Sequence, residues 1–332
     1  MTRTANPSGR LLPGLHKLDD ERNWLVHDPA TFAELMTIKQ SHLREKRADT
    51  LVTAAGCEES SLPAQREVLD MVVEHLPRRY PDSYSFDKAT QEIRVNVEHD
   101  NGSVTEAYDV ATWRSRSPLE LAGLLAQEDF VLVNSHRIEA GFVVFSFGRV
   151  AERIGSGMSL DEVHKNVQRF QPDLSKPVDR FFHKLTSAAP AWRSNFGLTW
   201  SGTLVSSPDR YPFRQAHAAD ATLTTPAEWM LNRIGEVGVG NAIWLKVEYQ
   251  TIKRLAVNAD YALFAVRTFV HPLHTLSSVP SAASTLAHNI RCAAEGDFKF
   301  YLGVEDAEVR GKLLEYLDGI AAAADRQRMN SL

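Results

Sequence analysis

The stretch IWLKVEYQTIKRL–AVNAD–YALFAVRTFV (residues 243–270) decides the fold of this chain. Two runs rich in β-branched and aromatic residues flank the short segment AVNAD, and this pattern is typical of a β-hairpin. In the first run, apolar Leu245 alternates with Lys246 and Glu248, so the charged side chains lie on the opposite face from the apolar ones. The sequence therefore predicts a long antiparallel hairpin in which one face carries charge.

The segments around this hairpin change character along the chain. Helical spacing dominates the N-terminal part, strand-like alternation follows, and a second helical block interrupts the strands. We expect helices over 28–47, 63–81, 117–129, 158–170, 175–187 and 306–327, and strands within 91–110, 130–148 and 195–205. This order predicts an α+β fold with an antiparallel sheet.

The helical block has a consequence for the sheet. Because it falls between the strands of 130–148 and those of 195–270, one of its helices can lie across a sheet face. We divide the chain into an N-terminal arm with helices (1–90), a sheet core (91–275) and a C-terminal helical segment (276–332), which together form one compact unit.

Composition excludes several classes of protein. The chain has 332 residues and a formal net charge of -5, which gives no basic surface for nucleic acid. It contains no run of about 18 apolar residues, so we expect no membrane span, and no apolar segment of signal-peptide type, which favours a cytoplasmic location. The two isolated cysteines, Cys57 and Cys292, cannot build a zinc site or an iron–sulfur cluster by themselves.

A histidine lies on an apolar helix face in MSLDEVHKNVQRF (158–170). Ser159 and Glu162 have the spacing of a capping box, which predicts a helix that begins here. His164 follows Leu160 by four residues and so points toward the same side. A buried histidine is usually a core residue whose nitrogens are satisfied by a carbonyl or water. The alternative is a metal or haem ligand, because one imidazole suffices to hold haem iron.

Lys246 and Glu248 are the second candidate feature. They lie two residues apart on one strand and therefore share a face. A solvent-facing ion pair would explain this spacing, and so would a polar patch inside a ligand cavity. Trp244 and Ile252 share the face and favour partial burial.

Several segments together resemble the alpha subunit of the haem-dependent oxidative N-demethylases. The order and spacing of the segments carry the resemblance more than any single motif. The segments are PGLHKL (13–18), NWLVHD (23–28), RRYP (78–81), QED (127–129), MSLDEVHKNV (158–167), KPVDRFFHKL…RSNFGL (176–198) and WLKVEYQTIKRLAVNADYALFAVRTFVHPL (244–273).

The resemblance implies a PAS-like antiparallel sheet with helices packed on one face, flanked by N-terminal and C-terminal helical extensions. It implies haem b as the cofactor and His164 as the proximal ligand to iron, with His183 as the competing ligand. Lys246 and Glu248 would orient the substrate. The haem propionates would pair with one or more of three arginines, Arg193, Arg254 and Arg267.

The implied activity is that of a haem-dependent monooxygenase that uses dioxygen to oxidise a small amine, as in oxidative N-demethylation. Because the chain lacks cysteines for electron transfer, a separate flavin and iron–sulfur reductase would supply the electrons. Two alternatives stay open: a haem-dependent tailoring enzyme that acts on a larger metabolite, and a non-catalytic haem or gas-binding protein of PAS-like fold.

Four positions depart from the family pattern. Lys246 and Tyr249 stand where the family has arginines, Ala256 replaces a proline, and Phe196 replaces a tryptophan. Lysine presents a point charge where arginine presents a planar fork, so the exchange at Lys246 alters how a polar ligand is held. We expect these changes to affect the substrate more than the fold.

Overall fold

The computed structural model describes residues 14–99, 102–146, 150–165, 170–205, 225–292 and 306–330. Its centre is a seven-stranded sheet in which all neighbouring strands are antiparallel. In spatial order the strands are β1 (His16–Lys17), β8 (Ala191–Thr199), β9 (Trp244–Arg254), β10 (Tyr261–Pro272), β6 (Asp129–Asn134), β7 (Arg137–Phe142) and β2 (Leu51–Thr53).

The predicted hairpin is confirmed as β9 and β10, the two longest strands of this sheet. Their pairing runs from Arg254 opposite Ala262 to Trp244 opposite Pro272. On β9 the side chains alternate as expected: Tyr249 donates its hydroxyl hydrogen to the carbonyl oxygen of Asn23 on one side of the sheet, whereas its neighbours on the strand point to the other side.

The N-terminal helices cover one face, which we call the N-terminal face. They are α1 (Pro29–Glu45), α2 (Arg47–Thr50), α3 (Glu58–Arg79), α4 (Val110–Arg116) and α5 (Pro118–Leu125), preceded by a short 3-10 helix, Glu21–Asn23. Asp28 caps α1 through the amide of Ala30, with Pro29 at the first position, an arrangement that suits a helix N-terminus. The helices bury side chains of β6, β7 and β10 in the largest apolar cluster.

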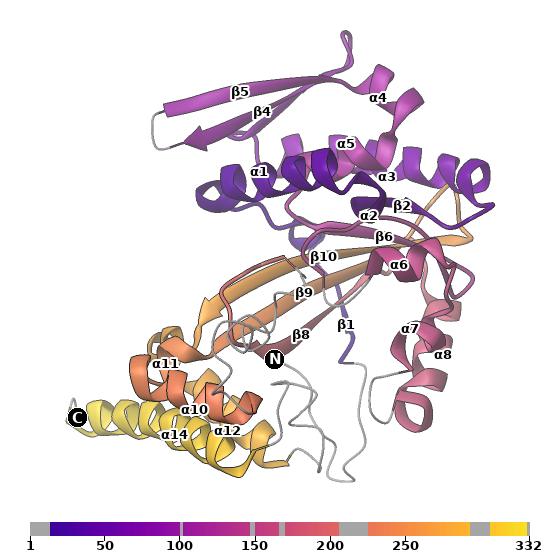
Figure 1. Ribbon diagram of the computed structural model, residues 1–332. Coiled ribbons are helices and arrows are strands. Elements are labelled where there is room, and N and C mark those ends of the chain that lie inside the picture. Colours follow the sequence, from indigo (N-terminus) through magenta and orange to yellow (C-terminus); the bar gives the residue numbers. More distant parts are fainter. Residues whose placement is uncertain are drawn as a thin grey trace.

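A second, three-stranded antiparallel sheet lies beyond these helices. It consists of β3 (Tyr84–Asp87), β4 (Glu92–His99) and β5 (Gly102–Asp109), so the strands expected within 91–110 are confirmed. Figure 1 shows the resulting layers, with α1, α3 and α5 between the small sheet and the large one. Strands β4 and β5 are therefore separated from the seven-stranded sheet by a helical layer.

The helical block between β7 and β8 lies against the opposite face, which we call the insertion face. It consists of α6 (Val150–Gly155), α7 (Leu160–His164), a π-helix (Phe170–Ser175) and α8 (Lys176–Lys184). Ile154 and Phe182 pack here against Val131, Ile252 and Ala262 of the sheet. Helices thus lie on both faces of the sheet, whereas the resemblance implied helices packed on one face, and the α+β class is confirmed.

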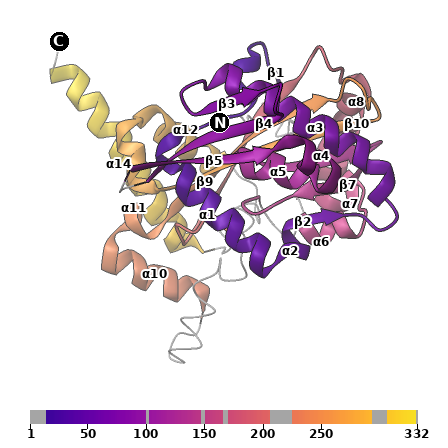
Figure 2. The same ribbon diagram turned by 90° about the horizontal axis from the view of Figure 1, so that it is seen from above.

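The C-terminal helices form a separate group. They are α10 (Pro226–Val237), α11 (Val239–Ala242), α12 (Pro280–Cys292) and α14 (Ala307–Asn330), with a 3-10 helix at Leu273–Ser278. Their apolar side chains pack with one another and with Phe196, Leu198 and Leu245. Figure 2 shows this group at one end of the molecule and α6, α7 and α8 at the other. Within the described ranges, none of the helices has both the length and the apolarity needed to cross a bilayer.

Candidate functional site

Polar side chains gather on the insertion face where β8 and β9 pair. The register sets Arg193 opposite Gln250 and Asn195 opposite Glu248, and directly paired residues of antiparallel strands point to the same side. Lys246 lies two residues from Glu248 on the same side. We call these five residues, Arg193, Asn195, Lys246, Glu248 and Gln250, the polar patch.

Lys246 is buried, with 2% of its surface exposed. Its ammonium group donates to the carbonyl oxygens of Phe145, at 2.8 Å, and Leu204, at 3.3 Å. Glu248 is also buried, at 4% exposed. The pair is therefore not the solvent-facing ion pair that the spacing alone allowed, because both charges lie inside the protein.

The carbonyl that holds Lys246 is itself fixed by Asp129 at the start of β6. One carboxylate oxygen, Oδ2 of Asp129, accepts hydrogen bonds from the amides of Phe145 and Ser146 and from the Ser146 hydroxyl, all at 2.7 to 2.8 Å. Thr268 of β10 donates to the same carbonyl oxygen of Phe145 at 3.4 Å. Asp129 thereby sets the position of Lys246 without touching it.

The other half of the polar patch contains buried polar atoms that lack partners. Gln250 donates from Nε2 to Oε2 of Glu248 at 2.9 Å. Among the described residues, neither Nε of Arg193 nor Oδ1 of Asn195 has a hydrogen-bond partner. Burial lowers the pKa of Arg193, and the carboxylate of Glu248 opposes that shift. An unsatisfied buried guanidinium nitrogen is costly, so this position is suited to an anionic ligand.

His164 lies at the end of α7, close enough to Arg193 for the guanidinium charge to act on the imidazole. The predicted capping box is confirmed, because Ser159 and Glu162 bond each other's backbone amides, and it fixes where this short helix begins. Nδ1 of His164 lies 2.7 Å from the carbonyl oxygen of Leu160, which can only accept, so Nδ1 carries the hydrogen and Nε2 has a lone pair. The ring stacks on Phe170 at a centroid distance of 4.7 Å.

The electrostatic surroundings keep this imidazole neutral. Burial lowers the pKa of His164, because removal from water disfavours the charged form. The Leu160 carbonyl opposes the shift, and the positive charges of Arg193 and Arg153 add to it. A neutral imidazole with one nitrogen held by a carbonyl is the form that ligates metals.

The other two candidate arginines are engaged elsewhere. Arg254 donates to the carbonyl oxygens of Phe182, Leu185 and Asp260, so it caps the end of α8. Arg267 lies on the N-terminal face, where it donates to Thr31 Oγ1 and to the Thr268 carbonyl oxygen. The structure brings only Arg193 of the three to the polar patch.

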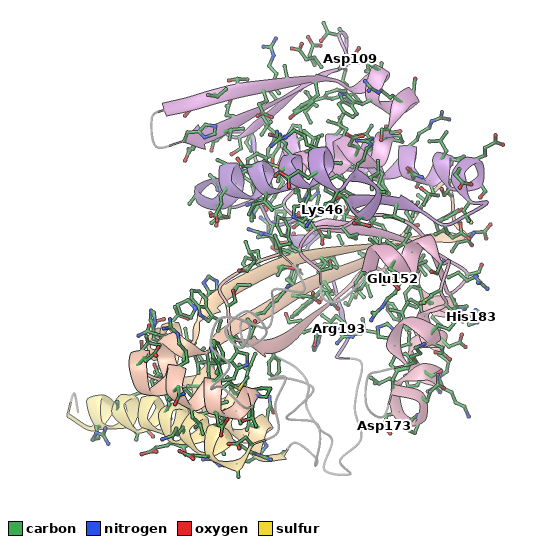
Figure 3. All side chains as sticks on the ribbon, viewed as in Figure 1. Lys46, Asp109, Glu152, Asp173, His183 and Arg193 are labelled. Atoms are coloured by element: carbon green, nitrogen blue, oxygen red, sulfur yellow. The ribbon has the colours of Figure 1, made fainter. Side chains whose placement is uncertain are left out.

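His183 is separated from the polar patch. Its side chain is 69% exposed on α8, and its Nε2 lies 3.8 Å from a carboxylate oxygen of Asp179. Figure 3 shows Arg193 at the sheet and His183 on the outer side of the α7–α8 segment. Of the two candidate haem ligands, only His164 adjoins the polar patch.

The departures from the family pattern fall in different places. Tyr249 lies on the N-terminal face, Phe196 packs with the C-terminal helices, and Ala256 lies in the β9–β10 turn, where its amide donates to Glu67. Lys246 is therefore the one departure of the four that belongs to the polar patch.

Sequence reasoning missed Asn195, Gln250 and Asp129 as members or supports of the site. Gln250 continues the alternation of Lys246 and Glu248, so strand periodicity could have included it. Asn195 could be placed only by the register between β8 and β9, and the sequence does not give that register. Asp129 acts through a turn, and a lone aspartate at a strand start carries no distinct signal.

Comparison with known families matches residues 14–310 to a family described as HODM_asu-like: Haem-dependent oxidative N-demethylase, alpha subunit-like. The match spans most of the chain, and it includes β8, β9, α7 and every residue of the polar patch. No curated protein matches the sequence.

Proposed function

This chain belongs to the haem-dependent oxidative N-demethylase, alpha subunit-like family, and from that premise we propose that it binds haem b against the polar patch and uses dioxygen to oxidise a small amine. His164 would ligate the iron, Arg193 would hold a propionate, and Lys246 and Glu248 would bind the substrate. Each assignment rests on the geometry of the insertion face.

The residues present fit a haem. The observation that carries the proposal is the unpartnered, buried Nε of Arg193 next to a neutral His164. A propionate is a carboxylate, and guanidinium pairs strongly with carboxylates. An anionic group at this point would satisfy the nitrogen that the described residues leave without a partner. The stacked ring of Phe170 adds an apolar surface beside the imidazole.

His164 has the features of a residue that would ligate haem iron. The hydrogen bond from Nδ1 to the Leu160 carbonyl oxygen fixes both the tautomer and the ring orientation, as hydrogen bonds to ligating histidines usually do. The lone pair on Nε2 would bind the iron. The capping box fixes the start of α7, so the ligand is held by an ordered helix end.

Bound haem would supply the one-electron and dioxygen chemistry. The protein would supply binding and proton control. Glu248 can accept a hydrogen bond from the ammonium group of a protonated amine, and Gln250 orients that carboxylate. Lys246, fixed by the Phe145 carbonyl oxygen, places a positive charge and N–H donors beside Glu248. Oxidation at an N-methyl carbon followed by hydrolysis would release an aldehyde.

The electrons would come from another protein. Cys57 and Cys292 are both free, and two separate cysteines do not hold an iron–sulfur cluster. A flavin and iron–sulfur reductase is therefore part of this proposal. Free thiols are also the usual state in a reducing compartment, which supports a cytoplasmic location.

The first test is an absorption spectrum of purified wild-type protein beside His164→Ala, with His183→Ala as the matched control. We expect a Soret band in the wild type and in His183→Ala, and its loss or shift in His164→Ala, because only the last variant removes the proposed ligand. An unchanged band in His164→Ala would assign the iron to another residue.

The second test separates an enzyme from a haem sensor. With reductant and a methylated amine, an N-demethylase consumes dioxygen in proportion to the aldehyde released. Dioxygen uptake without aldehyde would favour a tailoring reaction on another substrate. A haem-loaded protein without uptake for any amine would favour a non-catalytic gas-binding role.

A further inference from the structure

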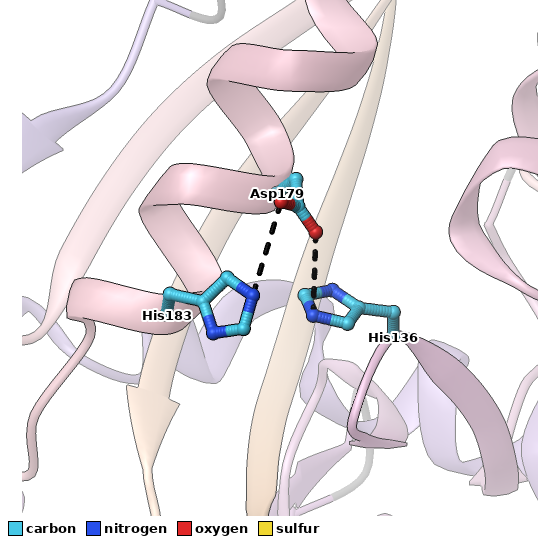
Figure 4. A group of neighbouring side chains, drawn as sticks. All are labelled: His136, Asp179 and His183. Carbon is cyan, nitrogen blue, oxygen red and sulfur yellow. Dashed lines mark ion pairs between the residues drawn. The ribbon is translucent and has the colours of Figure 1, made fainter.

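A second group of potential ligands lies apart from the polar patch. His136 at the β6–β7 turn faces Asp179 and His183 of α8, and the potential ligand atoms of the three residues all lie within 4.8 Å of one another. Figure 4 shows the two imidazole rings on either side of the Asp179 carboxylate. The two elements are distant in sequence and meet only in the folded chain.

Local structure presents all three side chains to the same point. Asp179 and His183 are four residues apart in α8 and so share one helix face. His136 occupies the tight turn between β6 and β7, where it has a φ of 78° and Ser135 has a φ of 41°. Two-residue hairpins of this kind favour Asn and Gly, so a histidine with positive φ is an unusual occupant.

The distances suit a metal ion better than a set of hydrogen bonds. Nε2 of His136 lies 3.4 Å from one carboxylate oxygen of Asp179, and Nε2 of His183 lies 3.8 Å from the other. Both distances exceed those of ordinary hydrogen bonds. Ligand atoms at about 2.0–2.1 Å from a tetrahedral Zn²⁺ are about 3.4 Å apart. A small rotation of the exposed His183 side chain brings the third ligand to that spacing.

We propose that His136, Asp179 and His183 bind a divalent transition-metal ion of the Zn²⁺ type. Two imidazoles and one carboxylate are the donors that such ions prefer, whereas Mg²⁺ and Ca²⁺ select oxygen ligands. Three protein ligands leave a coordination position for water or another small ligand. This proposal is independent of haem binding, because neither His136 nor Asp179 belongs to the polar patch.

The site is accessible. His136 and His183 both line a pocket of about 530 Å³ that also includes Arg254, Thr186 and Asp260. An ion can therefore enter, and the remaining coordination position can face this space. The positive charge of Arg254 is held by backbone carbonyls, so the guanidinium group is fixed within the pocket wall.

The ion would join the β6–β7 turn to the helical block between β7 and β8. His136 is on the turn of a sheet hairpin, and its carbonyl oxygen also accepts from the amide of Leu160 at 2.8 Å, at the start of the helix that ends at His164. A metal ion bound by His136 and α8 would therefore fasten α7 and α8 to the same turn.

The test is calorimetric titration of Zn²⁺ into the purified full chain after treatment with a chelator. We expect binding of one Zn²⁺ per chain in the wild type, and at least a tenfold loss of affinity in His183→Ala and in Asp179→Asn, since even outer-shell changes cost 10–100-fold. The control variants are His99→Ala, an exposed histidine on β4, and Cys292→Ser, because Cys292 and His288 lie 3.6 Å apart. Both should bind Zn²⁺ as the wild type does.

Two further measurements sharpen the result. Zn²⁺ should raise the melting temperature of the wild type but not that of His183→Ala, because an ion that binds only the folded state stabilises it. Titration with Mg²⁺ should give no binding at this site. Unchanged Zn²⁺ affinity in both ligand variants, or loss of binding in Cys292→Ser alone, would overturn the proposal. The Soret band of His183→Ala reports on haem binding alone. If the band is kept, failure of the metal proposal leaves the haem assignment intact.

Discussion

Arg193, which is half-buried, and Arg267, which is fully buried, carry guanidinium groups on opposite faces of the same sheet. Each has an Nε without a partner among the described residues, and burial lowers the pKa of each. The two differ in the charges around them. Arg267 lies near three carboxylates, those of Glu128, Asp28 and Asp129, whereas among the described residues Glu248 is the one carboxylate that acts on the pKa of Arg193.

The protein supplies Arg267 with further contacts. Its guanidinium group stacks on Phe269 at 4.7 Å from the ring centroid and donates to Thr31 and Thr268. Nearby, the fully buried Lys39 donates to the carbonyl oxygens of Gly123, Ala126 and Glu128. On the N-terminal face, buried charge is thus compensated by the protein itself.

The comparison shows that burial of a charge does not by itself mark a functional site. A buried charge that is paired and hydrogen-bonded serves the fold, and its removal leaves the partner charges uncompensated. A buried charge with few internal partners is costly unless a ligand completes it. Arg193 belongs to the second kind, which is why the ligand is assigned to the insertion face.

The largest expected effect comes from exchanging each arginine for methionine, which keeps the apolar stem. Arg267→Met should lower the free energy of unfolding of the haem-free protein by about 3–5 kcal/mol, because it leaves buried carboxylates uncompensated. Arg193→Met should change it by only about 1 kcal/mol or less but should weaken haem binding. Urea denaturation and haem titration measure the two effects.

Each variant is the control for the other. Arg267→Met that still folds at low temperature should bind haem normally, since Arg267 does not face the polar patch. Suppose that Arg193→Met destabilised the haem-free chain as strongly as Arg267→Met and bound haem normally. Both arginines would then serve the fold in the same way. The assignment of the ligand to the insertion face would then be wrong.

Local patterns predicted the fold well. Alternation placed Lys246 and Glu248 on one face, and the capping box at Ser159 predicted where α7 begins, because both signals depend on residues close in sequence. The same reasoning could not tell whether Lys246 was exposed or buried. Its burial depends on the Phe145 carbonyl, 101 residues away.

The site could be predicted only in part, for the same reason. The sequence offered Arg193, Arg254 and Arg267 as equal candidates, and only strand register and helix position distinguish them. The group of His136, Asp179 and His183 was missed because a hairpin turn and a helix must meet to form it. The i, i+4 pair in α8 was the available signal, but that spacing is common on helices.

A smaller effect is expected at the residue that links the two faces. Asp129 lies near Lys39 on one side and holds the turn at Phe145 on the other. Asp129→Asn should lower the free energy of unfolding by about 2–3 kcal/mol, because hydrogen bonds to a charged group are weakened. It should also reduce the rate of amine oxidation, because the carbonyl that fixes Lys246 is no longer held.

The haem spectrum distinguishes a positioning role from general damage. In Asp129→Asn the Soret band should stay, since His164 and Arg193 are not altered, while turnover falls. The matched control is Asp87→Asn, which removes an exposed aspartate that bonds the amide of Ala89, and it should keep full turnover. Normal turnover in Asp129→Asn would show that Lys246 does not need a fixed carbonyl.

The last effect, which appears only as the pH falls below neutral, concerns two histidines in the N-terminal part of the molecule. Burial is the main cause that lowers the pKa of both His27 and His75 to about 4. An unfolded histidine has a pKa of about 6.5, so between about pH 6.5 and pH 4 the unfolded chain binds more protons than the folded one. The free energy of unfolding should therefore be greatest above about pH 6.5 and fall as the pH decreases toward 4.

Urea denaturation of the haem-free protein at a series of pH values measures this dependence without interference from the polar patch. His75→Phe keeps a ring against Trp24, which His75 contacts edge-on at 4.9 Å, and it should reduce the dependence by removing one titrating group. His99→Ala, which removes an exposed histidine, should leave the dependence as it is. A flat profile in the wild type between about pH 7 and pH 5 would mean that both imidazoles gain partners for their protons in the folded state. The two faces of the sheet would then differ less in how they compensate buried charge than Arg193 and Arg267 indicate.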